Sequence, residues 1–445
     1  MRIICVMTLI FTVISGIGPN LGDALHASDF IITSSVSRDA SQLAENPEKE
    51  TGTLSVEKSA EKIRLQVDAG AYDRLGTIVS VQLPVAVDPG VYPLADEQGE
   101  VVALQVDDTN KGWFVLKELP AGTSAHFTLN LQFMDEAGDL SAGSRSGVHE
   151  QMDSATITYS TENGKVLSYY HSDNDPPDVL DDRFRRGGYI HPIYSPSGVI
   201  LSNHLNIDNQ PHHSGIWSAW TNTRFENRDP DFWNVHNETG RVDVDSLLHT
   251  WVGAVFGGFR SSHRFTDLSA EEPIVALNET WEVHVYTSSV NEEVHIFDLK
   301  VTQTVNTDRP LYLPEYRYGG IGFRGHKDWD DPEKGFFLTP DGLGRDGHAT
   351  RARWAHMGGY SDGELAGFAI LSHPSNYRFP QPMRIHPSAP FFNYAPTQLG
   401  DMSIQPGIPY VTRYRIITHD GGPDADLIDR LWQDYAYPPS VTISM

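Results

Sequence analysis

Alternation of apolar and polar residues at a period of two is the sequence feature that most restricts the fold of this chain. The stretches IRLQV (63–67), ALNETWEVHVYTS (276–288) and EEVHIFDLKVTQTV (292–305) follow it. Such alternation puts apolar side chains on one face of a strand and polar side chains on the other. The best helical pattern is DADLIDRLWQDY (424–435), with leucines and a tryptophan at helical spacing. The chain is therefore predicted to be all-β, with antiparallel sheets.

Composition divides the chain into a leader, a linker and two predicted β modules. Residues 1–27 combine Arg2, an apolar run and small residues, which is typical of a signal peptide; an uncleaved anchor is the alternative. Residues 28–62 are polar and predict a flexible linker. Strand-like segments predict a small β-sandwich over residues 63–150 and a larger sandwich domain over residues 151–437. The leader implies a secreted or periplasmic protein.

Charge and composition limit the expected partners. The formal net charge of −26 argues against nucleic-acid binding. Cys5, the only cysteine, lies in the leader, so no disulfide is expected in the mature chain. Beyond the leader, no apolar stretch approaches the roughly 18 residues that suggest a membrane span. The GxGxxG, Walker A and GxSxG motifs are absent from suitable contexts, so no cofactor is predicted and a serine hydrolase is disfavoured.

Side chains suited to catalysis and sugar binding concentrate in residues 183–241. Histidine titrates most easily near neutral pH, and tryptophan offers a flat apolar face to a sugar ring. The pair His212 and His213 supplies the predicted acid or base. The predicted substrate-binding residues of this stretch are His191, His204, Asp208, Trp217, Asp231 and Trp233. The histidine spacing matches no familiar zinc motif, so no metal is predicted, while a His-ligated metal-dependent enzyme stays open as an alternative.

Structural roles are the alternative for the same residues. Neighbouring residues on a strand point to opposite faces, so both His212 and His213 can face one cavity only if they lie in a loop. Buried histidines often make structural hydrogen bonds, and tryptophans more often belong to a core.

A second dense segment is LPEYRYGGIGFR (313–324). Glu315 is predicted to stay ionised beside arginine and to act as a catalytic partner. Tyr318 is the second catalytic candidate in this segment. Arg317 and Arg324 are predicted to hold a substrate carboxylate or sulfate through bidentate hydrogen bonds. The structural alternative is that these charged groups form buried ion pairs.

Four motifs carry a resemblance to a known family: GYIHPIYSPSGV (188–199), QPHHSGIWSAW (210–220), DFWN (231–234) and LPEYRYGGIGFRG (313–325). They resemble the secreted proteins grouped as DUF6807, often labelled "methane oxygenase PmoA", over most of residues 152–435. The label does not fit literally, because a membrane monooxygenase subunit needs several spanning helices. The resemblance implies a secreted β-sandwich protein connected with polysaccharide use. More weakly, the long antiparallel strands resemble the galactose-mutarotase-like supersandwich.

These observations lead to one functional hypothesis with two alternatives. We expect a secreted carbohydrate-active enzyme, a polysaccharide lyase or glycoside hydrolase, that uses a His/Glu/Tyr site on an oligosaccharide. A lyase needs a base beside a carboxylate held by cations, whereas a hydrolase usually needs two carboxyl groups. Asp208 and Asp231 are the candidates for a second carboxyl group beside Glu315. The alternatives are a noncatalytic carbohydrate-binding or surface protein and a His-ligated metal enzyme.

Overall fold

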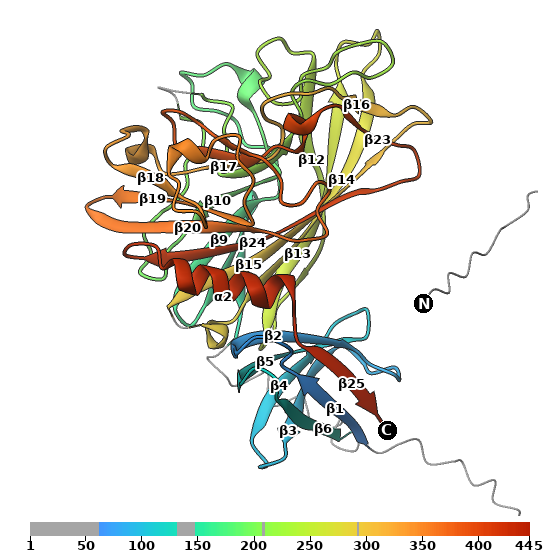
Figure 1. The fold of residues 1–445 in the computed structure, drawn as a ribbon. Coiled ribbons are helices and arrows are strands. Elements are labelled where there is room, and N and C mark those ends of the chain that lie inside the picture. The colour runs from blue at the N-terminus through green and yellow to red at the C-terminus, as the bar shows by residue number, and fades with distance from the viewer. Residues whose placement is uncertain (1–61, 131–146, 207–209, 292) are drawn as a thin grey trace, which may run out of the picture. The chain divides into compact units, whose positions relative to one another are not determined.

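The computed structural model describes residues 62–130, 147–206, 210–291 and 293–445 (Figure 1). The predicted leader, all of the predicted linker except Lys62, and Asp208 lie outside the described residues. All described residues fall within one compact unit, Lys58–Met445. Among them, no helix is both long and apolar enough to cross a membrane.

Seven antiparallel strands near the two ends of the described chain form one sheet in the order β2-β5-β4-β3-β6-β1-β25. Alternating side chains of this sheet, such as Leu65, Leu94 and Phe114, are buried in a core cluster of their own. The last strand comes from the C-terminus and pairs with the first, with Arg64 opposite Ser444. The strands are β1 (Lys62–Asp68), β2 (Arg74–Gln82), β3 (Gly90–Asp96), β4 (Val101–Val106), β5 (Lys111–Leu119), β6 (Ser124–Asn130) and β25 (Ser440–Ser444).

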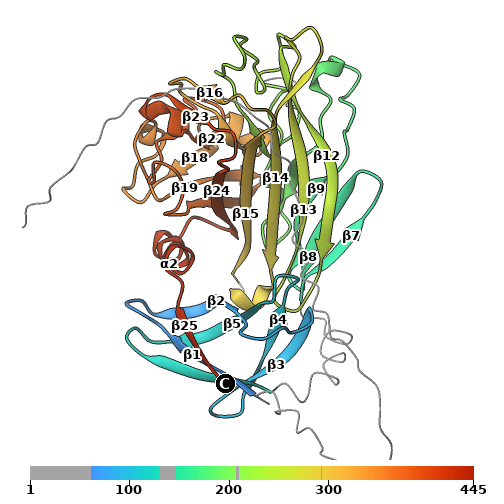
Figure 2. The same ribbon diagram turned by 90° about the vertical axis from the view of Figure 1, so that its right-hand side faces the viewer.

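Two eight-stranded antiparallel sheets make up most of the remaining structure. The first has the order β21-β22-β17-β11-β10-β9-β8-β7 and the second the order β12-β13-β14-β15-β24-β20-β19-β18. Figure 2 shows the long strands β12 to β15 side by side. The first sheet contains β7 (His149–Met152), β8 (Thr156–Thr161), β9 (Gly164–Tyr170), β10 (Tyr189–Ile193), β11 (Ile216–Ala219), β17 (Gly320–Arg324), β21 (Met383–Ile385) and β22 (Phe391–Tyr394). The second contains β12 (Gly240–Trp251), β13 (Phe256–Asp267), β14 (Ile274–Tyr286), β15 (Val294–Val305), β18 (Gly335–Leu338), β19 (Trp354–Ser361), β20 (Glu364–Ser372) and β24 (Tyr410–Asp420).

The main core lies between these two sheets. Tyr169 and Ile190 from the first sheet share one buried cluster with Trp281 and Phe297 from the second. Alternation at a period of two explains this packing, because every second residue of β14 and β15 faces the other sheet. The prediction of an all-β supersandwich built from antiparallel sheets is confirmed.

One α-helix, α2 (Ala425–Ala436), follows the last long strand, at the position that the sequence pattern predicts. Asp424 caps it by accepting hydrogen bonds from the backbone N–H groups of Asp426 and Leu427. Its buried face packs Leu431 and Trp432 into an apolar cluster with residues of β13 and β24. The described residues also form a two-stranded sheet, β16 (Leu311–Leu313) with β23 (Met402–Ile404), and the 3-10 turns η2 (Asp182–Phe184), η3 (Ser288–Val290), η4 (Lys327–Asp330), η5 (Arg345–Gly347) and η6 (Pro396–Leu399).

Candidate functional site

A small cavity brings together residues from the two dense segments of the sequence. It has a volume of about 120 Å³. Its lining residues are Gln210, His212, His213, Trp233, Asn234, Arg317, Tyr318, Arg384, His386 and Phe391. Five of the predicted site residues therefore meet here: His212, His213, Trp233, Arg317 and Tyr318. The two histidines lie in a loop before β11, which lets both face the same cavity.

The histidine loop is held by a close backbone crossing at Gly215. This residue has a φ of +52°, and a Cβ atom there would lie 2.0 Å from the carbonyl oxygen of Ile190. Only glycine fits such a position without displacement of the chain. The His213 backbone N–H donates to the Gln210 carbonyl (3.1 Å), and the Leu205 N–H donates to the His213 carbonyl (3.1 Å). The backbone on either side of His212 is therefore fixed.

His213 is enclosed by aromatic rings and is only 3% exposed. Its ring centroid lies 4.8 Å from that of Trp217, 4.8 Å from that of Phe391 and 6.2 Å from that of Trp233. Burial lowers the pKa of His213 well below its usual value, so the ring is neutral at neutral pH. Trp217 and Trp233 belong to an apolar cluster, and Trp217 does not line the cavity.

His212 faces two cavities. Besides the small one, it lines a larger cavity of about 390 Å³ whose walls include Arg186, Asp173 and Asp243. Burial, followed by the neighbouring His236, lowers the pKa of His212 to about 3. Its Nδ1 atom is buried and has no hydrogen-bond partner among the described residues. Such an atom needs a water molecule or a ligand as its partner.

Two arginines give the small cavity a positive wall. Burial, followed by nearby Arg317, lowers the pKa of Arg384, and its Nε has no partner within the described part of the chain. The guanidinium of Arg317 lies over the ring of Tyr318, 5.5 Å from its centroid. No carboxylate is present among the described lining residues. The cavity is therefore suited to an anionic group.

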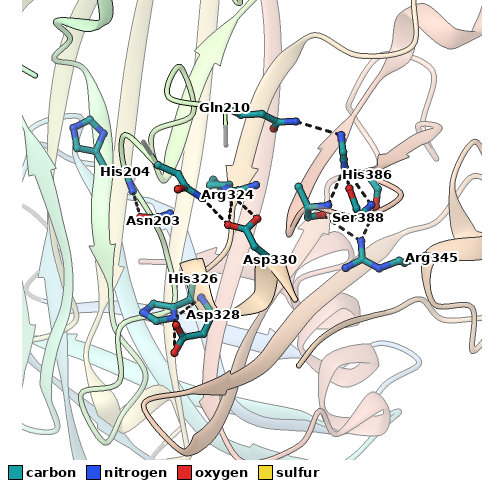
Figure 3. A network of polar contacts seen from close by, with 12 residues as sticks. Asn203, His204, Gln210, Arg324, His326, Asp328, Asp330, Arg345, His386 and Ser388 are labelled. Atoms are coloured by element: carbon teal, nitrogen blue, oxygen red, sulfur yellow. Dashed lines mark hydrogen bonds and ion pairs between the residues drawn. The ribbon is translucent and has the colours of Figure 1, made fainter. Parts of the chain in front are cut away.

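His386 completes this wall. Its Nδ1 accepts a hydrogen bond from the backbone N–H of Ala389 (2.9 Å), so a neutral ring carries its proton on Nε2. That atom lies 3.3 Å from the side-chain amide of Gln210 (Figure 3). Burial, followed by Arg384, lowers the pKa of His386 to about 4.

Sequence reasoning missed Gln210, Arg384 and His386. The stretch containing Arg384 and His386, RIHPSAPFFNY, shows a strand pattern and no motif. Only its pairing with the histidine segment through β17 brings it to the site: β11 pairs with β17, and β17 pairs with β22.

Asp231 has an indirect role in the geometry of this cavity. Its Oδ1 accepts the backbone N–H groups of Trp233 (2.9 Å) and Asn234 (3.0 Å), and its Oδ2 accepts the Asn234 side-chain amide (2.6 Å). Asn234 Oδ1 in turn accepts the Tyr318 hydroxyl (3.2 Å). Asp231 does not line the cavity, but it fixes the group that orients Tyr318.

His191 and His204 lie beside each other but outside this cavity. His191 Nδ1 is 2.8 Å from the Ser202 hydroxyl, and His204 Nε2 is 3.0 Å from the Tyr189 hydroxyl. Their ring centroids are 5.9 Å apart. Burial lowers the pKa of both, that of His191 to about 4.

The remaining predicted residues are separate from the lining. Glu315 is exposed, and its backbone N–H donates to Asp401 Oδ1 (2.7 Å). Arg324 is buried and pairs through Nη2 with both carboxylate oxygens of Asp330, at 2.6 and 2.9 Å (Figure 3). Asp208 lies outside the described residues. Within the described ranges, no three His, Cys, Asp or Glu side chains are grouped so that they could hold a metal ion.

Comparisons with known proteins identify the family of this chain. The chain matches none of the curated proteins. Among solved structures it is similar to the heparan sulfate lyase HepC from Pedobacter heparinus, at 9% sequence identity with a TM-score of 0.30, over 66% of this chain and 40% of the lyase. A mutant of that lyase gives the same identity and coverage with a TM-score of 0.27. The family model described as "Family of unknown function (DUF6807)" matches residues 156–433, and the chain belongs to this family.

Proposed function

We propose that this protein is a carbohydrate-active lyase that cleaves an acidic oligosaccharide next to a uronate residue. The observation that supports the proposal is the small cavity. It combines Arg317 and Arg384, the neutral rings of His212 and His386, and the Tyr318 hydroxyl, without a described lining carboxylate. Two guanidinium groups suit a substrate carboxylate, and neutral imidazole is the form that accepts a proton.

The proposed reaction is β-elimination. The arginines bind the uronate carboxylate and stabilise the negative charge that develops on it. His212 removes the proton from the carbon next to that carboxylate. The bond between the adjacent ring carbon and the glycosidic oxygen then breaks, and Tyr318 donates its proton to the leaving oxygen. One product carries a carbon–carbon double bond, and no water is added.

The low pKa of His212 has a direct bearing on this mechanism. A pKa of about 3 in the free protein makes the ring a weak base. A bound carboxylate next to the ring favours the imidazolium form and raises that pKa. Binding of an anionic substrate would thus bring the base closer to the working pH. Neutral sugars would not raise the pKa of His212, so the proposed site favours uronates in the proton-removal step as well as in binding.

A glycoside hydrolase is the second candidate, because five carboxylate residues line the larger cavity, Asp173 and Asp243 among them. Burial, followed by Asp243, raises the pKa of Asp173, as a general acid requires. His212 lies on the boundary between this cavity and the small one. The two candidates differ in whether water enters the products and in which substitution abolishes turnover.

The test incubates uronate-containing oligosaccharides with the parent protein and with three single-substitution variants of it. For the lyase, His212→Gln should abolish turnover while Asp173→Asn retains it; for the hydrolase, Asp173→Asn should abolish it. His126→Gln, which changes an exposed histidine on β6, is the matched control and should behave like the parent protein. Full turnover by His212→Gln would refute the proposed role of this histidine. Saturable binding without turnover in all proteins would instead make this a carbohydrate-binding protein.

We also propose that the protein works outside the cytoplasm, because residues 1–27 have the pattern of a signal peptide. The intact mass of the protein isolated from the culture medium or periplasm tests this. A mass that lacks the leader supports export, and retention of the full chain in the cytosol would contradict it.

A further inference from the structure

Two hollows away from the candidate site share a wall and form one groove. Their volumes are about 750 and 210 Å³. The residues common to both are Trp113, Glu282, His284, Lys300 and Arg413. Among the described residues, none that lines these hollows also lines either cavity at His212. The groove is therefore separate from the proposed catalytic site.

The floor of the groove is the outer face of the second eight-stranded sheet. Cross-strand pairing places its side chains in two rows across β12, β13, β14, β15 and β24. One row contains His249, Arg260, Glu282, Lys300 and Arg413, and the next contains Trp251, Gly258, His284, Asp298 and Arg415. The neighbouring residues Phe259, Val283 and Leu299 point into the core, so both rows point away from it.

The wall of the groove comes from the seven-stranded sheet. β5 contributes Lys111 and Trp113, and the turn before it contributes Asp107. A firm junction holds this wall beside the floor: Gln105 Nε2 donates to the Phe256 carbonyl (2.9 Å), and its Oε1 accepts the Val255 and Phe256 N–H groups (both 3.0 Å). The groove is thus a built feature of the fold.

Two tryptophans supply the flat apolar surfaces of the groove. Trp251 reaches across Gly258, where a Cβ atom would lie 3.2 Å from its ring, and its centroid lies 5.5 Å from that of His284. Its buried Nε1 has no hydrogen-bond partner among the described residues. Trp113 donates its indole N–H to Asp107 (2.8 Å). Both residues are half-buried and line the larger hollow, and Lys111 Nζ lies over the Trp113 ring, 4.2 Å from its centroid.

The charges of the groove nearly cancel. Glu282 contacts Arg260 (3.0 Å) and Lys300 (3.7 Å), and Asp298 pairs with Arg415 (2.7 Å). The chain as a whole carries a formal net charge of −26, so this balance is local. A charge-balanced surface offers donors and acceptors for hydroxyl groups without attracting a polyanion. Flat rings combined with such groups fit the apolar faces and the hydroxyl rims of sugar rings.

We propose that this groove is a second, noncatalytic binding site for a neutral saccharide chain. It would hold a part of a glycan that lacks uronate groups, apart from the cavity at His212. Trp251 is the main stacking surface, and the polar rows of β13, β14 and β15 bind the hydroxyl groups.

Affinity gel electrophoresis with soluble neutral polysaccharides embedded in the gel tests this proposal. The probes are arabinoxylan, galactomannan and mixed-linkage β-glucan, with pectate as the acidic comparison. At least one neutral polymer should retard the parent protein. Trp251→Ala should weaken that binding about tenfold, through loss of one stacking surface. Leu248→Ala, on the same strand and 52% exposed, should bind like the parent.

Two further variants keep the result interpretable. His212→Gln should retain full retardation, because it alters only the proposed catalytic site. His249→Ala removes an exposed ring that stacks on Trp251 at 5.6 Å, and it should weaken binding even if Trp251→Ala does not fold. Absence of retardation by all neutral polymers, retardation by pectate alone, or unchanged binding in both groove variants would overturn the proposal. Loss of binding in His212→Gln would do so as well.

Discussion

Replacement of Asp330 by alanine should destabilise the fold by leaving a buried cation without its partner. The Arg324 side chain is 0% exposed, and its Nη2 contacts the two Asp330 oxygens at 2.6 and 2.9 Å. Asp330 Oδ2 also accepts the Asn206 side-chain amide (2.6 Å). Arginine cannot release its proton at any ordinary pH, so the variant must either keep a buried charge or open the site to water.

The expected loss is about 3 kcal/mol, at the lower end of the range for breaking one partner of a buried ion pair. The lower end applies because the Asp330 side chain is 27% exposed, so water can partly replace it. The assay is urea unfolding followed by tryptophan fluorescence, with the loss read from the shift of the midpoint. Asp308→Ala is the control, since Asp308 and Arg309 form an exposed pair at 3.7 Å. A loss for Asp330→Ala as small as that of the control would refute the reasoning.

Three further predictions concern the candidate site. Between pH 6.5 and about 5, calorimetry should show a falling melting temperature, because His212 and His191, with pKa values of about 3 and about 4, stay neutral when folded but gain protons when unfolded. Each histidine contributes roughly 1.5 kcal/mol to the free energy of unfolding, present above pH 6.5 and lost as the pH falls to about 5. A constant melting temperature over this interval would contradict the prediction. Gly215→Ala should lower both the melting temperature and turnover, since its Cβ would lie 2.0 Å from the Ile190 carbonyl, and normal values for both would be evidence against a fixed loop. Arg384→Ala should raise KM for uronate substrates about tenfold or more, through loss of a charge-assisted bond, whereas an unchanged KM would separate Arg384 from substrate binding.

The fold could be predicted from the sequence where a local pattern determines it. In β14 and β15, alternation marks the buried face directly, and in α2 the spacing of Leu431 and Trp432 together with the prolines that follow marks the helix. The pairing of β25 with β1 left no such signal, because it joins the two ends of the described chain. Long-range pairing depends on the whole structure and not on a local pattern.

The candidate site was predictable only in its contiguous parts. His212, His213 and Tyr318 stand in motifs dense in functional side chains, and the cavity contains all three. Arg384 and His386 were missed because they reach the cavity through strand pairing. Glu315 lies in an irregular segment after β16, where no periodicity shows which side chains point inward, and it is exposed. Trp217 was predicted to bind substrate, but its ring belongs to a core cluster. The local pattern does not distinguish a tryptophan in the core from one that lines a cavity.

The most direct test of the proposed reaction is the mass of the products formed from a uronate-containing oligosaccharide of known mass. The mechanism at His212 and Tyr318 predicts two products whose masses add up to that of the substrate, with one product unsaturated, and no such products from His212→Gln. Products whose masses add up to that of the substrate plus one water molecule would contradict β-elimination and would place the chemistry on carboxylates such as Asp173.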